Sequence, residues 1–427
     1  MKTDAYGLPV TTSSATALEA YDRAARGLLG WDGRAVELFR TAARHDPTLA
    51  LAHAGEAIAL FLEERFDEAK TAAGMARVVA AGQTDRERSH VEALALLACG
   101  RARDAERAMR EHLGTFPRDL VVLQRLYFIW FWQGRFPEML QLTESMVGHY
   151  DDDSYMLGLH AFVLEEADRF GEARGVSEKA VRLNPRDAWA VHAFAHTLYE
   201  MRESDLGVTA LPPAIHPCSH CGWFRNHLAW HLALMHLARG EYDRASRMSR
   251  GIFERAPSSI PGDLHDSISL LWRLDLCGRP AGARWKAFAA IARERMTKPV
   301  IHYHAIHLGM ALAAGGDWAG VERQRATFRE RAPKDRSGLV GGLVLPVLEG
   351  MQAFAAGDYR RTIERIEPVR DSIVQLGGSR AQRDIYHDTL LEACFRAGDA
   401  ERAERLLAAR LARRADHFWA TRRARVA

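Results

Sequence analysis

The chain has 427 residues, 48% of them apolar, and its 58 basic and 55 acidic residues leave a formal net charge of only +3. That balance gives no excess of basic residues that would favour binding to nucleic acid. No run reaches the roughly 18 uninterrupted apolar residues of a membrane span. We therefore expect the protein to bind neither nucleic acid nor a membrane. Five scattered cysteines favour a reducing, cytoplasmic setting. The N-terminus lacks a basic segment followed by an apolar core, so we expect no secretory signal.

Residues 1–14 are predicted to be an irregular lead-in, and Thr11 to Ser14 form a cluster of N-cap residues before the first helix. From residue 15 to 427 a short pattern recurs. It starts with glycine, often followed two residues later by an aromatic residue, at Gly134, Gly240, Gly316 and Gly357, and more weakly at Gly30, Gly100 and Gly398. In five places a proline follows the start of the pattern by 17 residues: Pro47, Pro117, Pro185, Pro257 and Pro333.

The spacing of the pattern indicates the fold class. Gly100 and Gly134 are 34 residues apart, whereas later copies such as Gly316 and Gly357 are 41 apart. A period of about 34 residues is typical of tetratricopeptide repeats, in which pairs of helices stack because no pair can bury its apolar face alone. The sequence therefore predicts an all-α, tetratricopeptide-like helical-repeat superhelix, an α-solenoid, with about nine or ten helix pairs in a single continuous array.

One stretch interrupts the helical period. Residues 203–224 contain Pro212, Pro213, Pro217 and Gly222, so we expect an insertion loop there. Long loops in compact arrays often act as lids or binding elements. The same stretch holds Cys218 and Cys221 at a zinc-like spacing, but a second cysteine pair is missing and an ordered loop is the favoured interpretation.

Polar residues gather on the predicted helices in the middle of the array. They occur in pairs three or four residues apart, so each pair projects from one helical face. The pairs are His192 and His196, His227 and His231, Asp263 and Asp266, and His304 and His307. Because packed helices are about 8–10 Å apart, these side chains can converge on one cavity.

Imidazoles with carboxylates suit two kinds of chemistry. They bind divalent metals such as zinc, iron or manganese, and they act as general acids and bases near neutral pH. The candidate metal ligands are His192, His196, His227 and His231. A buried histidine taken alone is more often held by an ordinary hydrogen bond, and the alternative of a structural role stays open for each of them.

A glycine-rich turn supplies a further candidate. Gly377 and Gly378 break the helical pattern, Ser379 can cap the next helix, and Arg383 can clamp a carboxylate or phosphate. An ordinary helix–helix turn is the equal alternative.

At these residues the chain resembles the tetratricopeptide repeat protein 38 family. The similarity runs along nearly the whole chain and is strongest at 187–196, 227–233, 263–274 and 374–384. The resemblance implies an α-helical repeat fold and an intracellular setting, and it does not imply a defined reaction. The residues that match the family in type are His192, His196, His227, His231, Asp263, Asp266, His307 and Arg383, whereas His265 and His304 do not match.

We therefore predict a pocket on the concave face that binds a small polar or anionic ligand. If the protein is an enzyme, we expect this pocket to catalyse hydrolysis or elimination. His231 or His307 would be the general base, Asp266 would orient an imidazole or a metal, and a bound metal would activate water. The predicted ligand-binding residues are His192, His196, His227, Trp230, Asp263, Gln382 and Arg383. The alternative is a non-catalytic scaffold that binds a peptide of a protein partner in its groove, an inference from fold analogy alone.

Overall fold

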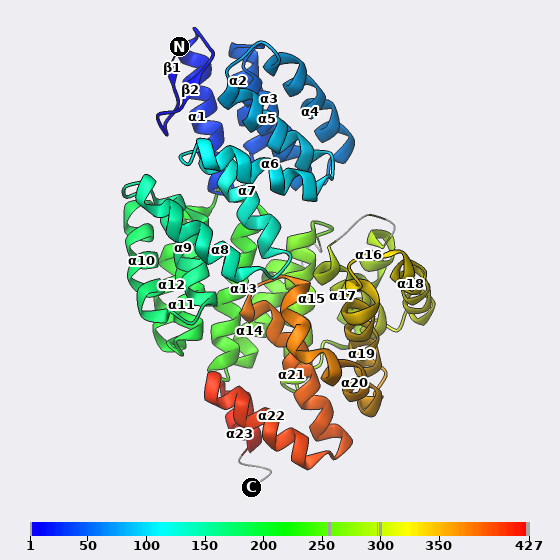
Figure 1. Ribbon diagram of the computed structural model, residues 1–427. Helices are drawn as coiled ribbons and strands as arrows, with labels where there is room; N and C mark the ends of the chain where they lie inside the picture. Colours follow the sequence, from blue (N-terminus) through cyan, green and yellow to red (C-terminus); the bar gives the residue numbers. More distant parts are fainter. Residues whose placement is uncertain (1, 255–257, 297, 299–300, 424–427) are drawn as a thin grey trace. The chain divides into compact units, whose positions relative to one another are not determined.

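The computed structural model describes residues 2–254, 258–296, 298 and 301–423, and over these ranges the protein is all-α and of the tetratricopeptide-like helical-repeat class (Figure 1). Up to residue 200 the helices are α1 Ala15–Leu29, α2 Ala35–His45, α3 Ala50–Leu62, α4 Phe66–Ala80, α5 Asp85–Ala98, α6 Ala102–Thr115, α7 Leu120–Phe131, α8 Phe136–Met146, α9 Ser154–Glu166, α10 Phe170–Leu183 and α11 Ala188–Glu200.

The later helices are α12 Ser204–Ile215, α13 Trp223–Ala238, α14 Tyr242–Ser249, α15 Pro261–Leu276, α16 Trp285–Arg295, α17 His302–Ala314, α18 Trp318–Arg331, α19 Leu345–Ala355, α20 Tyr359–Ile366, α21 Arg380–Ala397, α22 Ala400–Arg413 and α23 His417–Arg423. Short 3-10 or π segments are η1 Val147–His149, η2 His216–Cys218, η3 Arg250–Glu254, η4 Gly282–Arg284, η5 Ala332–Lys334, η6 Val340–Val344 and η7 Glu367–Leu376.

Consecutive helices from α1 to α22 pair into eleven hairpins within the described ranges, and the turn of every hairpin holds one residue with a φ between 60° and 80°. Glycine adopts this left-handed conformation without steric cost, whereas other residues rarely do. The residues in these turns are Trp31, Glu64, Gly100, Gly134, Asp168, Arg202, Gly240, Gly278, Gly316, Gly357 and Gly398. The repeat is therefore defined by a backbone conformation. The described ranges contain eleven hairpins, more than the nine or ten helix pairs that the sequence predicts.

The aromatic residue of the pattern begins the second helix of several hairpins. Phe136, Tyr242, Trp318 and Tyr359 are the first residues of α8, α14, α18 and α20. The residue before the helix caps it in some repeats, as where the Asp317 carboxylate accepts from the Gly320 N–H group at 3.0 Å. Pro257, one of the prolines spaced by 17 residues, lies outside the described residues.

The lead-in is more regular than the sequence predicts. β1 (Lys2–Thr3) and β2 (Pro9–Val10) pair antiparallel. The Ser14 side chain then accepts a hydrogen bond from Ala17 N and caps α1, as the cluster of capping residues indicates.

The insertion loop expected at 203–224 is largely helical. α12 occupies Ser204–Ile215 and contains Pro212 and Pro213, and the short segment η2 follows it. Arg202 takes the left-handed conformation in the turn before α12, so α12 is the second helix of an ordinary hairpin. The prolines fall in its last turn, where the helix ends within two residues of Pro213 and few backbone hydrogen bonds are lost.

The chain divides into two compact units. The first comprises the chain up to Phe131 together with 136–194 and 214–225, and the second comprises 132–135, 195–213 and the chain from Asn226 onward. The sequence predicts a single continuous array, but the two units are interleaved along the chain, and α11 begins in the first and ends in the second.

Three first helices of hairpins form the centre of the second unit. Residues 262–274 of α15 and 303–313 of α17 are all buried, and so is most of α21. A helix that is covered on every side must bury its polar residues too. The candidate site lies on these helices together with α13 and the end of α11. In the described part of the chain, no helix combines the length and the apolar character that crossing a membrane requires.

Candidate functional site

Asp266 on α15 is the centre of a buried polar cluster in the second unit. Its Oδ2 lies 2.8 Å from His227 Nδ1 on α13, and its Oδ1 lies 3.3 Å from His265 Nε2. Burial by itself would raise the pKa of the Asp266 carboxyl, but the neighbouring His227 and His265 lower it below its ordinary value. The carboxylate is therefore ionised and accepts hydrogen bonds from imidazoles.

The cluster continues along α13. His231 Nε2 lies 3.3 Å from His227 Nε2, one helical turn away. Asp266 accepts from the Nδ1–H group of His227, and the Nε2 atoms of His227 and His231 share one hydrogen bond, whose donor is the ring that carries the hydrogen at Nε2. Asp266 thereby orients the His227 ring, which in turn contacts His231.

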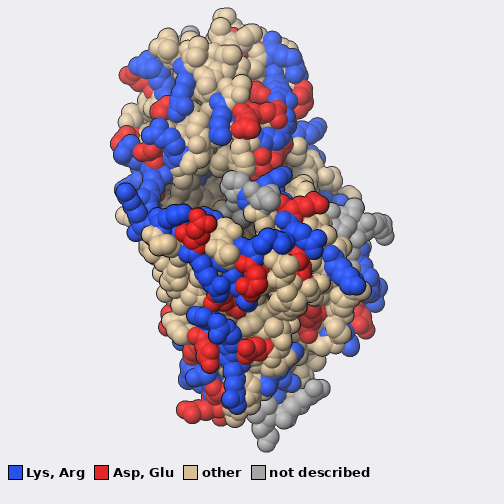
Figure 2. Space-filling view, turned by 90° about the vertical axis from the view of Figure 1, so that its right-hand side faces the viewer, with Lys and Arg blue, Asp and Glu red and all other residues tan. Residues whose placement is uncertain are grey.

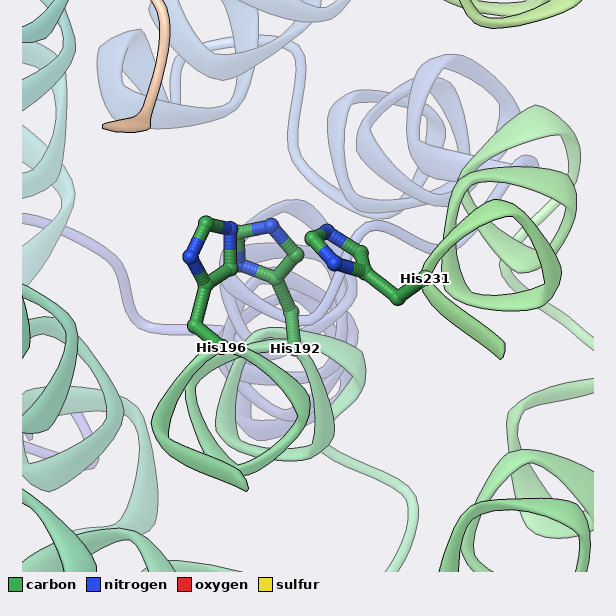
Figure 3. Close-up of side chains that lie close together, drawn as sticks. All are labelled: His192, His196 and His231. Carbon is green, nitrogen blue, oxygen red and sulfur yellow. The ribbon is translucent and has the colours of Figure 1, made fainter. Parts of the chain in front are cut away.

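Helix α11 brings further imidazoles (Figure 3). His192 and His196 project from the same side of α11, one turn apart, and His231 projects from α13. The ring centroids of His196 and His231 are 4.5 Å apart. Burial, followed by the charges of neighbouring groups, lowers the pKa of both His196 and His231 well below the ordinary value, so both rings are neutral at pH 7.

His307 on α17 lies near His265, with 5.9 Å between the ring centroids. Its Nδ1 donates to the Tyr303 carbonyl oxygen at 2.9 Å, which leaves Nε2 as the lone-pair nitrogen of the neutral ring. Burial lowers the pKa of His307 to about 3. His307 therefore offers a hydrogen-bond acceptor at neutral pH.

Several polar atoms beside His307 have no hydrogen-bond partner among the residues that the structure describes. They are Tyr303 Oη, Tyr386 Oη, His307 Nε2, His265 Nδ1 and both ring nitrogens of His304. The rings form a contiguous group: the Tyr303 centroid is 4.4 Å from His307, 5.3 Å from His265 and 6.2 Å from Tyr386. Burial raises the pKa of both tyrosines, so both hydroxyls are donors.

Gln382 and Arg383 lie in the first turn of α21. Ser379 N donates to Gln382 Oε1 at 2.8 Å in a capping box at the start of α21, and the Gln382 amide nitrogen lies 3.5 Å from His265 Nε2. The Arg383 guanidinium donates to the Gly378 carbonyl oxygen. Asp384, whose pKa is held well below its ordinary value by arginines that outweigh burial, pairs with Arg414 at 2.7 Å and also with Arg413.

The remaining predicted residues, Asp263 and Trp230, surround the cluster. Asp263 Oδ1 accepts from Asn226 Nδ2 at 3.0 Å, at the start of α15. Trp230 stacks on His227 with ring centroids 5.5 Å apart, and the Arg273 guanidinium carbon lies 5.5 Å from the Trp230 ring centroid. Arg273 also donates to the Ala381 carbonyl oxygen at 2.7 Å and so ties α15 to α21.

The structure thus brings His227, His231 and Asp266 into direct contact, with His196 beside them and His307 reached through His265. Sequence reasoning missed Tyr303, Tyr386 and Arg273. One signal for Tyr303 was available, because it precedes His307 by four residues on one helical face. No sequence signal connects Tyr386 or Arg273 to the cluster, because they meet it through tertiary packing.

A second buried cluster lies in the first unit. Asp119 Oδ2 lies 2.7 Å from His90 Nδ1, 3.1 Å from His112 Nε2 and 3.0 Å from Arg86 Nη2. Arg86 also donates to Asp4 at 2.8 Å, which ties the lead-in to α5. Three donors on one carboxylate oxygen fill its acceptor capacity, and these contacts join α5, α6 and the residue before α7.

An open groove of about 280 Å³ lies on the surface of the second unit, around the start of α14. Arg244 and Arg247 are exposed on the same side of α14, and the Arg279 guanidinium carbon lies 5.7 Å from the Tyr242 ring centroid. The groove is lined by Gly240, Glu241, Tyr242, Asp243, Arg244, Arg247 and Arg279. Elsewhere, basic and acidic side chains alternate over the face in Figure 2, in keeping with the near-zero net charge.

No protein-family model matches the chain. Among solved structures it is similar to one described as Naa15/Naa10 bound to HypK-THB, with 13% identity and a TM-score of 0.26, over 92% of this chain and 62% of that chain. It is also similar to the TPR domain of P58(IPK), with 11% identity and a TM-score of 0.20, over 90% of this chain and 98% of that one. The chain thus spans less than two thirds of the length of the first structure. Similarities with identities and TM-scores this low say nothing of what this chain binds.

Proposed function

We propose that the protein is an interaction scaffold that binds an acidic segment of a protein partner in the groove at the start of α14. The observation that carries this proposal is the set of arginines that line the groove: Arg244, Arg247 and Arg279. A guanidinium matches a carboxylate with two parallel hydrogen bonds, so three of them favour aspartate or glutamate side chains or a C-terminal carboxylate.

The charges around the groove support this choice of partner. Of its two carboxylates, Glu241 is already engaged by Arg239 at 2.8 Å and by His236 at 2.6 Å. Asp243 lies 3.5 Å from Arg279, and both side chains are at least half exposed. The groove therefore keeps an excess of positive charge, while Tyr242 gives it an apolar floor on which a partner's side chain can pack.

The test is peptide binding measured by fluorescence anisotropy at low and moderate salt. We expect a labelled peptide rich in glutamate to bind more tightly than its glutamine counterpart. The double variant Arg244→Ala/Arg247→Ala should weaken that binding about five- to thirtyfold, or about 1–2 kcal/mol.

The matched control is Arg107→Ala/Arg110→Ala, two exposed arginines with the same spacing on α6. An equal loss of affinity in both double variants would mean that only general charge attraction operates, and the groove proposal would be wrong. Equal binding of the glutamate and glutamine peptides would also contradict it.

A second candidate function is binding of a small polar ligand by the buried cluster, with or without catalysis. It is favoured by the unpartnered atoms of Tyr303, His307 and Tyr386, because buried polar groups without partners cost free energy that a ligand would offset. In the catalytic version His307 or His231 is the base and Asp266 orients an imidazole. The ligand-binding roles of His192, His196, His227, Trp230, Asp263, Gln382 and Arg383 belong to this candidate.

This candidate requires that the hydroxyl of Tyr386 be free to bond a ligand, which a Tyr386→Phe variant tests. Membership of the tetratricopeptide repeat protein 38 family and a cytoplasmic location are two further proposals. Both rest on the sequence alone.

A further inference from the structure

We propose that Cys218 and Cys221 are a modification site at which hydrogen peroxide forms a reversible intramolecular disulfide. Both thiols are free and buried, and they lie in the segment between α12 and α13. This segment belongs to the first unit, whereas the groove at the start of α14 belongs to the second. The inference therefore goes beyond the scaffold function and does not depend on it.

The first argument is the backbone between the two cysteines. The Cys221 N–H group donates to the Cys218 carbonyl oxygen at 3.1 Å, and Ser219 has a φ of −61° and a ψ of −21°. Both features are typical of a type I β-turn, which holds its first and fourth Cα atoms within about 7 Å of each other. A disulfide needs Cα atoms about 4.4–6.8 Å apart. The turn thus brings the two residues to a spacing that a disulfide accepts.

The second argument is the contact between the two side chains. A hydrogen bond between the thiols lowers the pKa of Cys218 below its ordinary value, and the same bond, together with burial, raises the pKa of Cys221. The thiolate is the nucleophile in thiol oxidation. Cys218 is therefore the residue that peroxide oxidises first, and Cys221 is already beside it to complete the disulfide.

A shared metal ion is the other use of this cysteine spacing, and the structure does not favour it. A structural zinc site needs four ligands. Among the described residues, no group of three or more His, Cys, Asp or Glu ligand atoms close enough to share an ion includes Cys218 or Cys221. Carbonyl oxygens lie beside the sulfurs instead: that of Gly30 at 3.4 Å from Cys221 Sγ, and that of Pro185 at 3.7 Å from Cys218 Sγ.

The reaction consumes two thiols and one peroxide. The Cys218 thiolate attacks a peroxide oxygen, the O–O bond breaks, and the hydroxide that leaves takes up the proton that Cys218 released. Cys221 then attacks the sulfur of the resulting sulfenic acid. The S–S bond forms, the S–O bond breaks, and the second hydroxide leaves with the Cys221 proton as water. Two sulfurs are oxidised and peroxide is reduced to water, and a dithiol reductant reverses the bond by thiol–disulfide exchange.

Peroxide gains access through the turn itself. Ser219 and Gly222 are exposed, whereas both cysteine side chains are covered. Oxidation therefore needs local opening of the turn, and we expect it to be slower than that of an exposed thiolate. The same burial protects the thiols from bulky reagents in the folded protein.

The experiment treats the folded, full-length protein with hydrogen peroxide, then unfolds it, alkylates the remaining thiols and digests it with trypsin. The tryptic peptide 203–225 contains Cys218 and Cys221 and no other cysteine. Without peroxide, mass spectrometry should show this peptide with two alkyl groups. After peroxide, most of it should carry none and be two hydrogen atoms lighter than the free dithiol. Dithiothreitol added before alkylation should restore both thiols.

Single variants identify the role of each cysteine. Cys221→Ser should stop at the sulfenic acid of Cys218, which dimedone labels, whereas Cys218→Ser should keep an unoxidised thiol at Cys221. The matched control is Cys394→Ser, because Cys394 is a buried cysteine on α21, away from the turn. It should form the disulfide as the native protein does.

Three results would overturn the proposal: a native peptide 203–225 that keeps two thiols after peroxide, one that gains oxygen atoms without losing two hydrogens, or loss of the disulfide in Cys394→Ser. The native peptide decides the question even where a variant fails to fold.

Discussion

Buried tyrosine hydroxyls in this protein fall into two groups. Tyr127 on α7 donates to the Leu159 carbonyl oxygen at 2.9 Å, and Tyr150 donates to the Pro117 carbonyl oxygen at 2.7 Å. Tyr303 and Tyr386 are just as buried, but among the described residues nothing accepts from their hydroxyls. The difference matters because a buried hydroxyl that is satisfied stabilises the fold, whereas one that is not costs free energy until a ligand bonds it.

We predict that Tyr386→Phe leaves the free energy of unfolding of the ligand-free protein unchanged or raises it, because the variant removes a polar atom that makes no internal bond. Tyr127→Phe is the control and should lower that free energy by about 1 kcal/mol, the usual net value of such a hydrogen bond. Urea unfolding followed by circular dichroism gives both values. An equal loss in the two variants would mean that the Tyr386 hydroxyl has an internal partner, and the small-ligand candidate would lose its support.

At the scale of the element, the hairpin turn is the unit that repeats. Its left-handed residue is glycine in seven hairpins and another residue in four. The conformation alone does not decide what a substitution costs, because the turns differ in their surroundings. A Cβ atom built on Gly134 would lie 1.9 Å from the Val374 carbonyl oxygen, whereas one built on Gly316 would meet nothing within 4 Å.

Gly134→Ala should therefore destabilise the second unit by about 3 kcal/mol or more, because both the strain of a positive φ and a clash with backbone oppose it. Gly316→Ala, with a φ of 78°, carries only the strain and should cost about 1 kcal/mol. Thermal unfolding of the two variants measures the difference. Equal costs would show that the turn between α7 and α8 does not approach η7 as closely as the structure indicates.

At the scale of the whole molecule, the second unit is assembled from distant parts of the chain. Arg414, at the end of α22, pairs with Glu200 at 2.7 Å, with Asp384 at 2.7 Å and with Asp416 at 3.0 Å. These side chains are largely buried, and Arg414 also lies over the Tyr199 ring at 3.8 Å. A buried network of this kind joins α11, α21 and α22 and leaves costly charges behind when one member is removed.

We expect Arg414→Met to lower the free energy of unfolding by about 3–5 kcal/mol, since three carboxylates lose their shared partner. The pair of exposed Arg405 and half-buried Glu367, at 3.0 Å, provides the comparison, and Arg405→Met should cost less than about 1 kcal/mol. Urea unfolding of both variants tests the contrast. A small effect at Arg414 would mean that neighbouring arginines such as Arg410 compensate for its loss.

The sequence by itself determined the helical-repeat class, the starts of second helices at Phe136, Tyr242, Trp318 and Tyr359, and the pairing of His227 with His231, because these depend on local periodicity. It did not reveal the hairpins that turn at Glu64 and Arg202, since nothing local marks a non-glycine residue as left-handed, and it read the prolines of α12 as a loop.

Only the tertiary structure decided which polar residues meet. Asp266 on α15 contacts His227 on α13, Arg383 donates to the Gly378 carbonyl oxygen of its own turn, and Tyr386 joins the cluster from α21, more than a hundred residues after α15 in the sequence. Such contacts depend on how helices pack, which is a property of the whole chain and not of any short pattern within it.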